Sequence, residues 1–229
     1  MIARIVEDLP RFLGYWNLLF LLQAMATTLF LSAVGCVAGV ALGFLAAALR
    51  RHPSRALLPL KVLIVAYVEA FRRIPFLVTL MLVFFAFQLN KIDVPMFVVA
   101  LVSVGLIAAA FIAEIVRSGL DSVHRNQWDA AATLNMGYAQ TLRLVVMPQA
   151  WKVVLPPAFS FFVLFIKDTA LASQIGVVEL TYAGKVLNDK GFAAALTFGT
   201  ILLLYFALSY PLTRLGRTLE RRLAASRRR

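Results

Sequence analysis

Long uncharged stretches of apolar residues alternate with short segments that carry most of the charges. The first stretch, residues 12–49, contains no charged residue, and a helix needs only about 20 apolar residues to cross a membrane. The pattern predicts five membrane-spanning helices: about 18–49, about 57–89, 94–116, one that begins after Pro148 and is interrupted by Lys167 and Asp168, and 192–213. The sequence therefore predicts an all-α integral membrane protein, organised as a single domain over residues 1–229.

The composition agrees with this fold and excludes several classes of protein. Of the 229 residues, 62% are hydrophobic and 15% are charged, whereas soluble domains are about half apolar and about a quarter charged. A soluble enzyme and a disordered chain are therefore excluded. The single cysteine, Cys36, permits no intrachain disulfide, and His52 and His124 lie far apart beside polar residues. We therefore expect no metal site.

The distribution of Lys and Arg predicts the orientation, because basic residues gather on the cytoplasmic side of a membrane. Fifteen of them lie in segments 50–61, 117–152 and 214–229, against five in segments 1–11, 89–93 and 176–191. Since five spans place the termini on opposite sides, we expect the N-terminus outside and the C-terminus in the cytoplasm. The net charge of +12 follows this topology, and no nucleic-acid partner is expected.

Gly35, Gly39 and Gly43 recur at every fourth position of the first predicted span. They share one face of a helix, where the missing side chains let a second helix approach closely. The spacing predicts a packing surface, either within the chain or between two subunits.

Segment 117–148 is the longest polar stretch, and its pattern predicts a helix–turn–helix. Asn126 is a favourable N-cap, and Asp129 three residues later gives a start similar to a capping box. Asn135 and Gly137 both tolerate the positive φ that a reversal of the chain requires. A short alanine-rich helix with an exposed Trp128 suits docking into a groove on another protein.

This loop resembles the cytoplasmic "EAA" signature of ABC importer permeases. That signature runs Glu-Ala-Ala, three residues, Gly, nine residues, and then an apolar–x–Leu–Pro ending. The matching residues here are Asp129-Ala130-Ala131, Asn135 at the glycine position, and Val145-Val146-Met147-Pro148. The spacing is kept, while Asp replaces Glu, Asn replaces Gly and Met replaces Leu. Asp keeps the charge at the helix start, and Asn tolerates a left-handed turn.

The resemblance extends over about residues 18–223. The segments VEAFRRIPFLV, AEIVRSGLDSV, LPPAFSFFVLFIKDTALASQIGVVEL and LERRL also follow the pattern of one subfamily. The chain is identified as a member of the polar amino-acid ABC importer permeases of the histidine/glutamine type. These are inner-membrane components of binding-protein-dependent transport systems in the bacterial cytoplasmic membrane.

The resemblance implies a type I importer fold in which this chain forms the path for a polar amino acid or similar small zwitterion. The implied partners are a second permease subunit, identical or related, two ABC ATPase subunits and an extracytoplasmic solute-binding protein. The chain has no G-x-x-x-x-G-K-[ST] loop, so ATP and magnesium are expected in the ATPase, with no cofactor and no enzyme activity here. The residues expected to couple to the ATPase are Trp128, Asp129, Ala130, Ala131, Asn135 and Gly137.

Charged residues inside a membrane are costly, at about 2.5–3.5 kcal/mol each on insertion scales, so they mark either a polar path or structural ion pairs. Both interpretations stay open from the sequence. Pro75 is expected to bend its helix beside these charges. Helical spacing allows Glu69 to pair with Arg72 or Arg73, and Glu114 with Arg117. The candidate residues for a translocation path are Glu69, Arg72, Glu114, Lys167, Asp168, Thr169 and Ser173.

Two other functions share some of these features with the importer. A gradient-driven secondary amino-acid transporter would also contain intramembrane charges, but it needs no docking loop for an ATPase, and no inverted repeat is visible in the spans. A membrane enzyme needs clustered catalytic residues, which His52 and His124 do not provide. The residue types do not distinguish basic, acidic or amide amino acids, opines and small osmolytes as the substrate.

Overall fold

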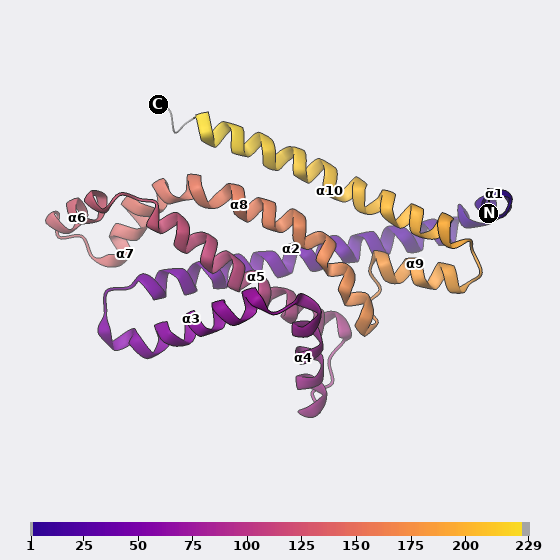
Figure 1. The fold of residues 1–229 in the computed structure, drawn as a ribbon, viewed down its shortest axis with the longest axis horizontal. Coiled ribbons are helices and arrows are strands. Elements are labelled where there is room, and N and C mark those ends of the chain that lie inside the picture. Colours follow the sequence, from indigo (N-terminus) through magenta and orange to yellow (C-terminus); the bar gives the residue numbers. More distant parts are fainter. Residues whose placement is uncertain (1, 226–229) are drawn as a thin grey trace. The chain divides into compact units, whose positions relative to one another are not determined.

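The computed structural model describes residues 2–225, and every element in that part of the chain is a helix (Figure 1). This confirms the predicted all-α fold. The elements in chain order are α1 (Ile2–Phe12), α2 (Tyr15–Arg51), η1 (Arg55–Leu57), α3 (Leu58–Arg73), α4 (Phe76–Leu89), α5 (Met96–Asp121), α6 (Arg125–Thr133), α7 (Tyr138–Thr141), η2 (Leu142–Val146), α8 (Met147–Asp168), η3 (Thr169–Ile175), α9 (Leu180–Asp189) and α10 (Ala194–Ala225).

Four helical stretches are long and apolar enough to cross a membrane: Tyr15–Arg51, Met96–Asp121, Tyr138–Ile175 and Ala194–Leu223. A fifth span is formed if α3 and α4, which together meet the same test, are one broken span. The described chain therefore contains four or five candidate spans, and the predicted five is the upper number. The Arg-rich tail used for the orientation is only partly covered, because residues 226–229 lie outside the described part of the chain.

The expected bend at Pro75 is confirmed, but the predicted single helix over 57–89 is two helices, α3 and α4, bent by 117° between Arg73 and Phe76. Ile74 is extended, with φ −82° and ψ 133°. A proline ring disfavours the helical conformation in the residue before it, and proline has no N–H for the helical ladder. Pro75 therefore ends α3, and the chain starts a new helix at Phe76.

The fourth predicted span begins earlier than expected, because the chain is helical from Tyr138, ten residues before Pro148. Pro148 does not open this helix. The Met147 N–H donates a hydrogen bond to the Leu142 carbonyl, five residues earlier, in a π-helical turn. The helix therefore continues through Pro148. The expected interruption at Lys167 and Asp168 is a change from α-helix to the 3-10 helix η3 after Asp168.

The described chain packs as two compact units, each built from separated segments. Unit 1 contains the chain up to Val34 with Phe76–Val104 and Val163–Thr213, and unit 2 contains Gly35–Pro75, Gly105–Phe162 and the chain from Arg214. Neither unit is a continuous stretch of sequence. The single-domain organisation stays a prediction.

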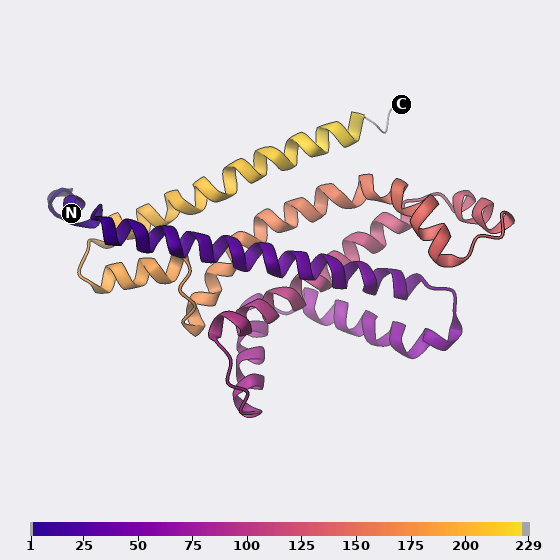
Figure 2. The ribbon, with the colours of Figure 1, turned by 180° about the vertical axis from the view of Figure 1, so that it is seen from behind.

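In unit 1, the short helix α1 is fixed to the turn between α9 and α10, beside which it lies in Figures 1 and 2. Arg4 donates to the Gly191 carbonyl at 3.0 Å, and Asp8 accepts from the Ala193 N–H at 2.9 Å. Phe12 is buried with its ring edge-on to Phe192 at 5.4 Å. These contacts join the start of the chain to the α9–α10 turn.

In unit 2, the predicted glycine surface packs α2 against α5 within the chain. A Cβ atom at Gly39 would lie 2.3 Å from the Ala108 Cβ, and one at Gly43 would lie 2.7 Å from the Ala109 carbonyl oxygen. Neither distance leaves room for a side chain. Glycine at these two positions therefore sets the distance between the helices.

Candidate functional site

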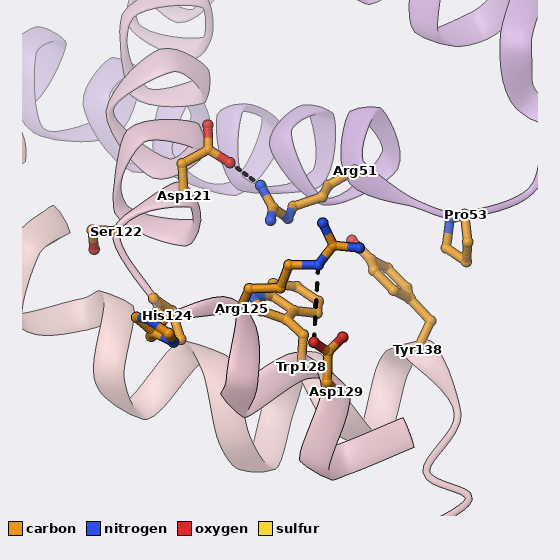
Figure 3. A pocket seen from close by; sticks show the side chains of 10 residues that line it. Arg51, Pro53, Asp121, Ser122, His124, Arg125, Trp128, Asp129 and Tyr138 are labelled. Carbon is orange, nitrogen blue, oxygen red and sulfur yellow. Dashed lines mark hydrogen bonds and ion pairs between the residues drawn. The ribbon is translucent and has the colours of Figure 1, made fainter. Parts of the chain in front are cut away.

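The cap of the short helix α6 lies two residues earlier than predicted. His124 is the N-cap, and its Nδ1 accepts from the Asn126 N–H at 3.3 Å. The predicted cap at Asn126 is therefore wrong, and so is the capping-box role of Asp129. Asp129 is exposed and lies 3.9 Å from the Arg125 guanidinium one turn back, as Figure 3 shows.

The turn after α6 contains one of the two predicted left-handed residues. Asn135 has φ 57°, which confirms its predicted role. Gly137 has φ −66° and is the N-cap of α7, where its N–H donates to Gln140 Oε1 at 3.1 Å. The prediction for Gly137 is wrong because one left-handed residue already reverses the chain.

One face of α6 is attached to the core of unit 2. Ala131 is buried. Trp128 is half-buried and packs on a hydrophobic cluster that contains Val116 and Leu120, so its predicted exposure is wrong. The Trp128 ring stacks on Tyr138 at 6.4 Å, and the Arg51 guanidinium lies 4.8 Å from the Trp128 ring centre. The Tyr138 hydroxyl donates to the Ala48 carbonyl at 2.7 Å. These contacts fix α6 to the C-terminal end of α2.

The other face of α6 is exposed and carries Asp129 and Ala130. A pocket of about 660 Å³ lies beside it, and Figure 3 shows Arg51, Trp128 and Tyr138 on its wall. The structure therefore brings together Trp128, Asp129, Ala130 and Ala131 on one short helix. It places Asn135 and Gly137 in the turn that follows.

Glu114 lies at the centre of a group of arginines in unit 2. Arg117 donates to it from two nitrogens, at 2.5 Å and 3.0 Å, which confirms the predicted pair. Arg50 approaches at 3.5 Å and Arg72 at 3.7 Å. A pocket of about 360 Å³ is lined by these charges and by apolar residues: Arg72, Phe111, Glu114, Ile115, Arg117, Ser118, Val153 and Pro157.

The two pairings that the sequence allowed for Glu69 are now distinguished. Glu69 accepts from Arg73 at 2.6 Å, while Arg72 lies against Glu114. The Glu69–Arg73 pair is exposed, with 78% of the Arg73 side chain accessible. Arg72 and Glu114 line the smaller pocket, whereas Glu69 is not among its lining residues.

The other predicted path residues belong to unit 1. Lys167 is exposed and Asp168 half-buried, and neither forms an ion pair with another residue of the described chain. Thr169 is buried, lies 3.5 Å from the Ser32 hydroxyl and donates to the Ile166 carbonyl at 2.7 Å. Ser173 accepts from Lys185 at 3.2 Å. The predicted residues thus form two groups, one in each unit.

Sequence reasoning missed Glu179, which is fully buried in unit 1. It is the N-cap of α9 and accepts from the Thr181 and Tyr182 N–H groups at 3.0 Å and 2.8 Å. It also accepts from the Tyr205 hydroxyl at 2.6 Å. Burial raises the pKa of this carboxyl above its ordinary value, and these hydrogen bonds act against the rise. Glu is not a preferred N-cap, so no local pattern indicates this role.

Sequence reasoning also treated Arg50 and Arg51 only as markers of topology. In the structure, Arg51 donates to Asp121, and Arg50 pairs with Glu114. Both contacts join the C-terminal end of α2 to α5.

Among residues 2–225, no three His, Cys, Asp or Glu side chains lie together in a way that could hold a metal ion.

The comparison with known proteins decides the family. Residues 39–225 match the family described as "Binding-protein-dependent transport system inner membrane component". The chain belongs to this family. It is a membrane protein of the ABC importer permease class with the type I importer fold, rather than a gradient-driven carrier.

Curated relatives align over most of their own length. The chain is similar to the probable glutamine ABC transporter permease protein GlnP of Bacillus subtilis, with 33% identity over 89% of this chain and 94% of the relative. It is also similar to the probable amino-acid ABC transporter permease protein YckA of Bacillus subtilis, with 34% identity over 82% of each protein. The glutamine transport system permease protein GlnP of Escherichia coli is 30% identical over 89% of this chain and 92% of the relative.

Solved structures agree with the fold. One, described as an amino acid ABC transporter with histidines, aligns with a TM-score of 0.80 and 27% identity, over 89% of this chain and 94% of that chain. The MetNI methionine ABC transporter in an inward-facing conformation aligns with a TM-score of 0.76 over 92% of this chain and 99% of that chain. At 22% identity, the second likeness concerns the fold alone.

Proposed function

We propose that this permease forms the membrane path of an ATP-driven importer for a polar amino acid or a similar small zwitterion. The observation that carries the proposal is the helix α6, whose one face is anchored in the core of unit 2 while its other face is exposed. Relatives that align over most of this chain are named as glutamine or amino-acid permeases, which supports the substrate class.

In this proposal, α6 is the helix that receives the closing movement of the ATPase. Its exposed residues, Asp129 and Ala130, meet the ATPase, and Trp128 and Ala131 transmit the movement to the core. Asn135 and Gly137 form the turn that returns the chain to α7. ATP and magnesium bind in the ATPase subunits, and this chain contributes no cofactor. The mechanism is a rigid-body switch between outward-open and inward-open states.

Two groups of residues are proposed for the path of the substrate. In unit 2, the pocket with Arg72 and Glu114 offers a cation for a carboxylate and an anion for an ammonium group. In unit 1, Lys167 and Asp168 offer the same pair of charges, beside the hydroxyls of Thr169 and Ser173. Glu69 is the weakest candidate, because Arg73 already neutralises it at an exposed position.

The remaining partners follow from the family and the topology. A second permease subunit, identical or related, completes the membrane part, two ATPase subunits bind on the cytoplasmic side, and a solute-binding protein delivers substrate from outside. The excess of Lys and Arg near α6 supports a cytoplasmic α6 and C-terminus, with the N-terminus outside the bacterial inner membrane.

Substrate-stimulated ATP hydrolysis by the reconstituted complex tests this function. We expect one or a few members of a panel of amino acids, bound to the solute-binding protein, to stimulate hydrolysis by the wild type. Asp129→Arg reverses a charge on the exposed face of α6, and we expect it to reduce the stimulation at least about fivefold, the lower end of typical coupling effects. Asp189→Arg, which reverses an exposed charge on α9, is the matched control. An Asp129→Arg complex with full stimulation would remove α6 from the coupling surface.

A further inference from the structure

Arg117 connects two carboxylates on α5. It donates to Glu114, one turn before it, at 2.5 Å and 3.0 Å, and to Asp121, one turn after it, at 2.5 Å. A guanidinium group is planar and has several fixed donors, so it can hold two carboxylates in a defined geometry. The α5 side chains thus form a rigid row along the C-terminal part of this helix.

At one end this row reaches α6. Asp121 accepts from Arg51, and Figure 3 shows the Arg51 side chain extending from the end of α2 towards Asp121. The same guanidinium lies 4.8 Å from the centre of the Trp128 ring. A cation over an aromatic face is attracted by the electron-rich ring. Arg51 is therefore held at the same time by α5 and by α6.

At the other end the row reaches α3. Glu114 lies 3.7 Å from the Arg72 guanidinium, which also lies 5.9 Å from the Phe111 ring. Arg72 is the last residue but one of α3, two residues before the break at Ile74. The row therefore connects α6, the helix proposed to meet the ATPase, with Arg72, which lines the smaller pocket at the end of α3.

We infer that these five residues, the ionic chain Arg51–Asp121–Arg117–Glu114–Arg72, convey the movement of α6 to the proposed substrate pocket of unit 2. Asp121 is a positioning residue, since it does not line the smaller pocket and is not proposed to touch the ATPase. Arg117 lines that pocket and also holds both carboxylates. This inference rests on the proposed function and names the element that regulates its pocket.

The unequal number of positive and negative groups explains why removing the Asp121 charge is expected to disturb more than one ion pair. The ionic chain with Arg50 contains four guanidinium groups and only two carboxylates, all 20–38% exposed. Isolated ion pairs at such exposure stabilise a fold only slightly, so their main effect is on geometry. Loss of the Asp121 charge releases Arg51 and Arg117 from each other, while the apolar core of unit 2 stays intact.

The test compares Asp121→Asn with the wild type in the complete reconstituted complex, with the solute-binding protein and an amino acid that stimulates the wild type. The readouts are assembly with the ATPase, basal ATP hydrolysis, the KM for ATP, and the ratio of stimulated to basal hydrolysis. We expect Asp121→Asn to assemble with unchanged basal hydrolysis and KM, and to lose at least about fivefold in the ratio. Asp121→Glu keeps the charge and should retain at least half of the wild-type ratio. Asp189→Asn on α9 is the control for removing an exposed carboxylate.

Each contrary result has a separate meaning. An unchanged ratio in Asp121→Asn overturns the inference, and so does an Asp121→Glu variant as poor as Asp121→Asn. Failure of Asp121→Asn to assemble would assign the ionic chain a structural role and would also overturn it. If no amino acid stimulates the wild type, the proposed function itself has failed.

Discussion

Replacing Gly39 by leucine is expected to prevent the chain from folding into a stable permease. A Cβ atom at this position would lie 2.3 Å from the Ala108 Cβ and 2.9 Å and 3.0 Å from backbone atoms of Ala108 and Ala109. Backbone atoms of a packed helix cannot move aside as the end of a side chain can. We expect a cost of about 3 kcal/mol or more, at or above the usual upper end for overpacking. Size-exclusion chromatography of the detergent-solubilised protein measures the result as a loss of the monodisperse peak.

Gly105→Ala is the matched control for this substitution. Gly105 lies in α5, in the same unit, and a Cβ atom there would meet nothing within 4 Å. Alanine also favours a helix over glycine by about 1 kcal/mol, so this variant should purify at least as well as the wild type. A monodisperse Gly39→Leu protein would contradict the close packing of α2 on α5.

The second large effect is expected from Trp128→Ala, which removes the side chain that fixes α6 to the core. The ring is stacked on Tyr138, lies under the Arg51 guanidinium and packs on the hydrophobic cluster of unit 2. Truncating a buried tryptophan costs about 3–5 kcal/mol, and this half-buried one should lose a large part of that. We expect α6 to detach locally and the ratio of stimulated to basal ATP hydrolysis to fall at least about tenfold, within the usual range of coupling energies.

Trp128→Phe tests the contribution of the aromatic ring separately from that of the indole nitrogen. Within the described chain, the buried Trp128 Nε1 has no hydrogen-bond partner, so phenylalanine removes a polar group that gains nothing there. It retains an aromatic face for Arg51 and Tyr138. We expect Trp128→Phe to keep most of the stimulation in the same ATP hydrolysis assay. Equal losses in both variants would show that the stacking does not matter.

The spans were predictable because long apolar runs are a local property of the sequence, and the loop was predictable from its spacing. A bend at Pro75 was predictable, because proline interrupts the hydrogen-bond ladder of a helix, whereas the complete break into two helices bent by 117° was not. The cap of α6 was assigned to Asn126, although His124 provides the acceptor, because an imidazole ring is an uncommon cap. The helix break and the position of the α6 cap both depend on the backbone conformation of single residues.

The parts of the site that depend on distant residues were not predictable. Arg51 and Asp121 are 70 positions apart, and no spacing rule relates them. The choice of Arg73 for Glu69, and of Arg72 for Glu114, depends on how α3 packs beside α5. The pairs within one helix, such as Glu114 with Arg117, were predictable because one helical turn separates them. Tertiary packing therefore determined which of the allowed pairs form.

The most direct test of the central claim is uptake of the stimulating amino acid into proteoliposomes that contain the complete complex. ATP and the transmembrane gradients of protons and sodium are varied independently, with the loaded solute-binding protein on the outer side. We predict that uptake requires ATP on the cytoplasmic side and continues when ionophores abolish both gradients. Uptake that proceeds without ATP and follows an imposed proton or sodium gradient would contradict the account.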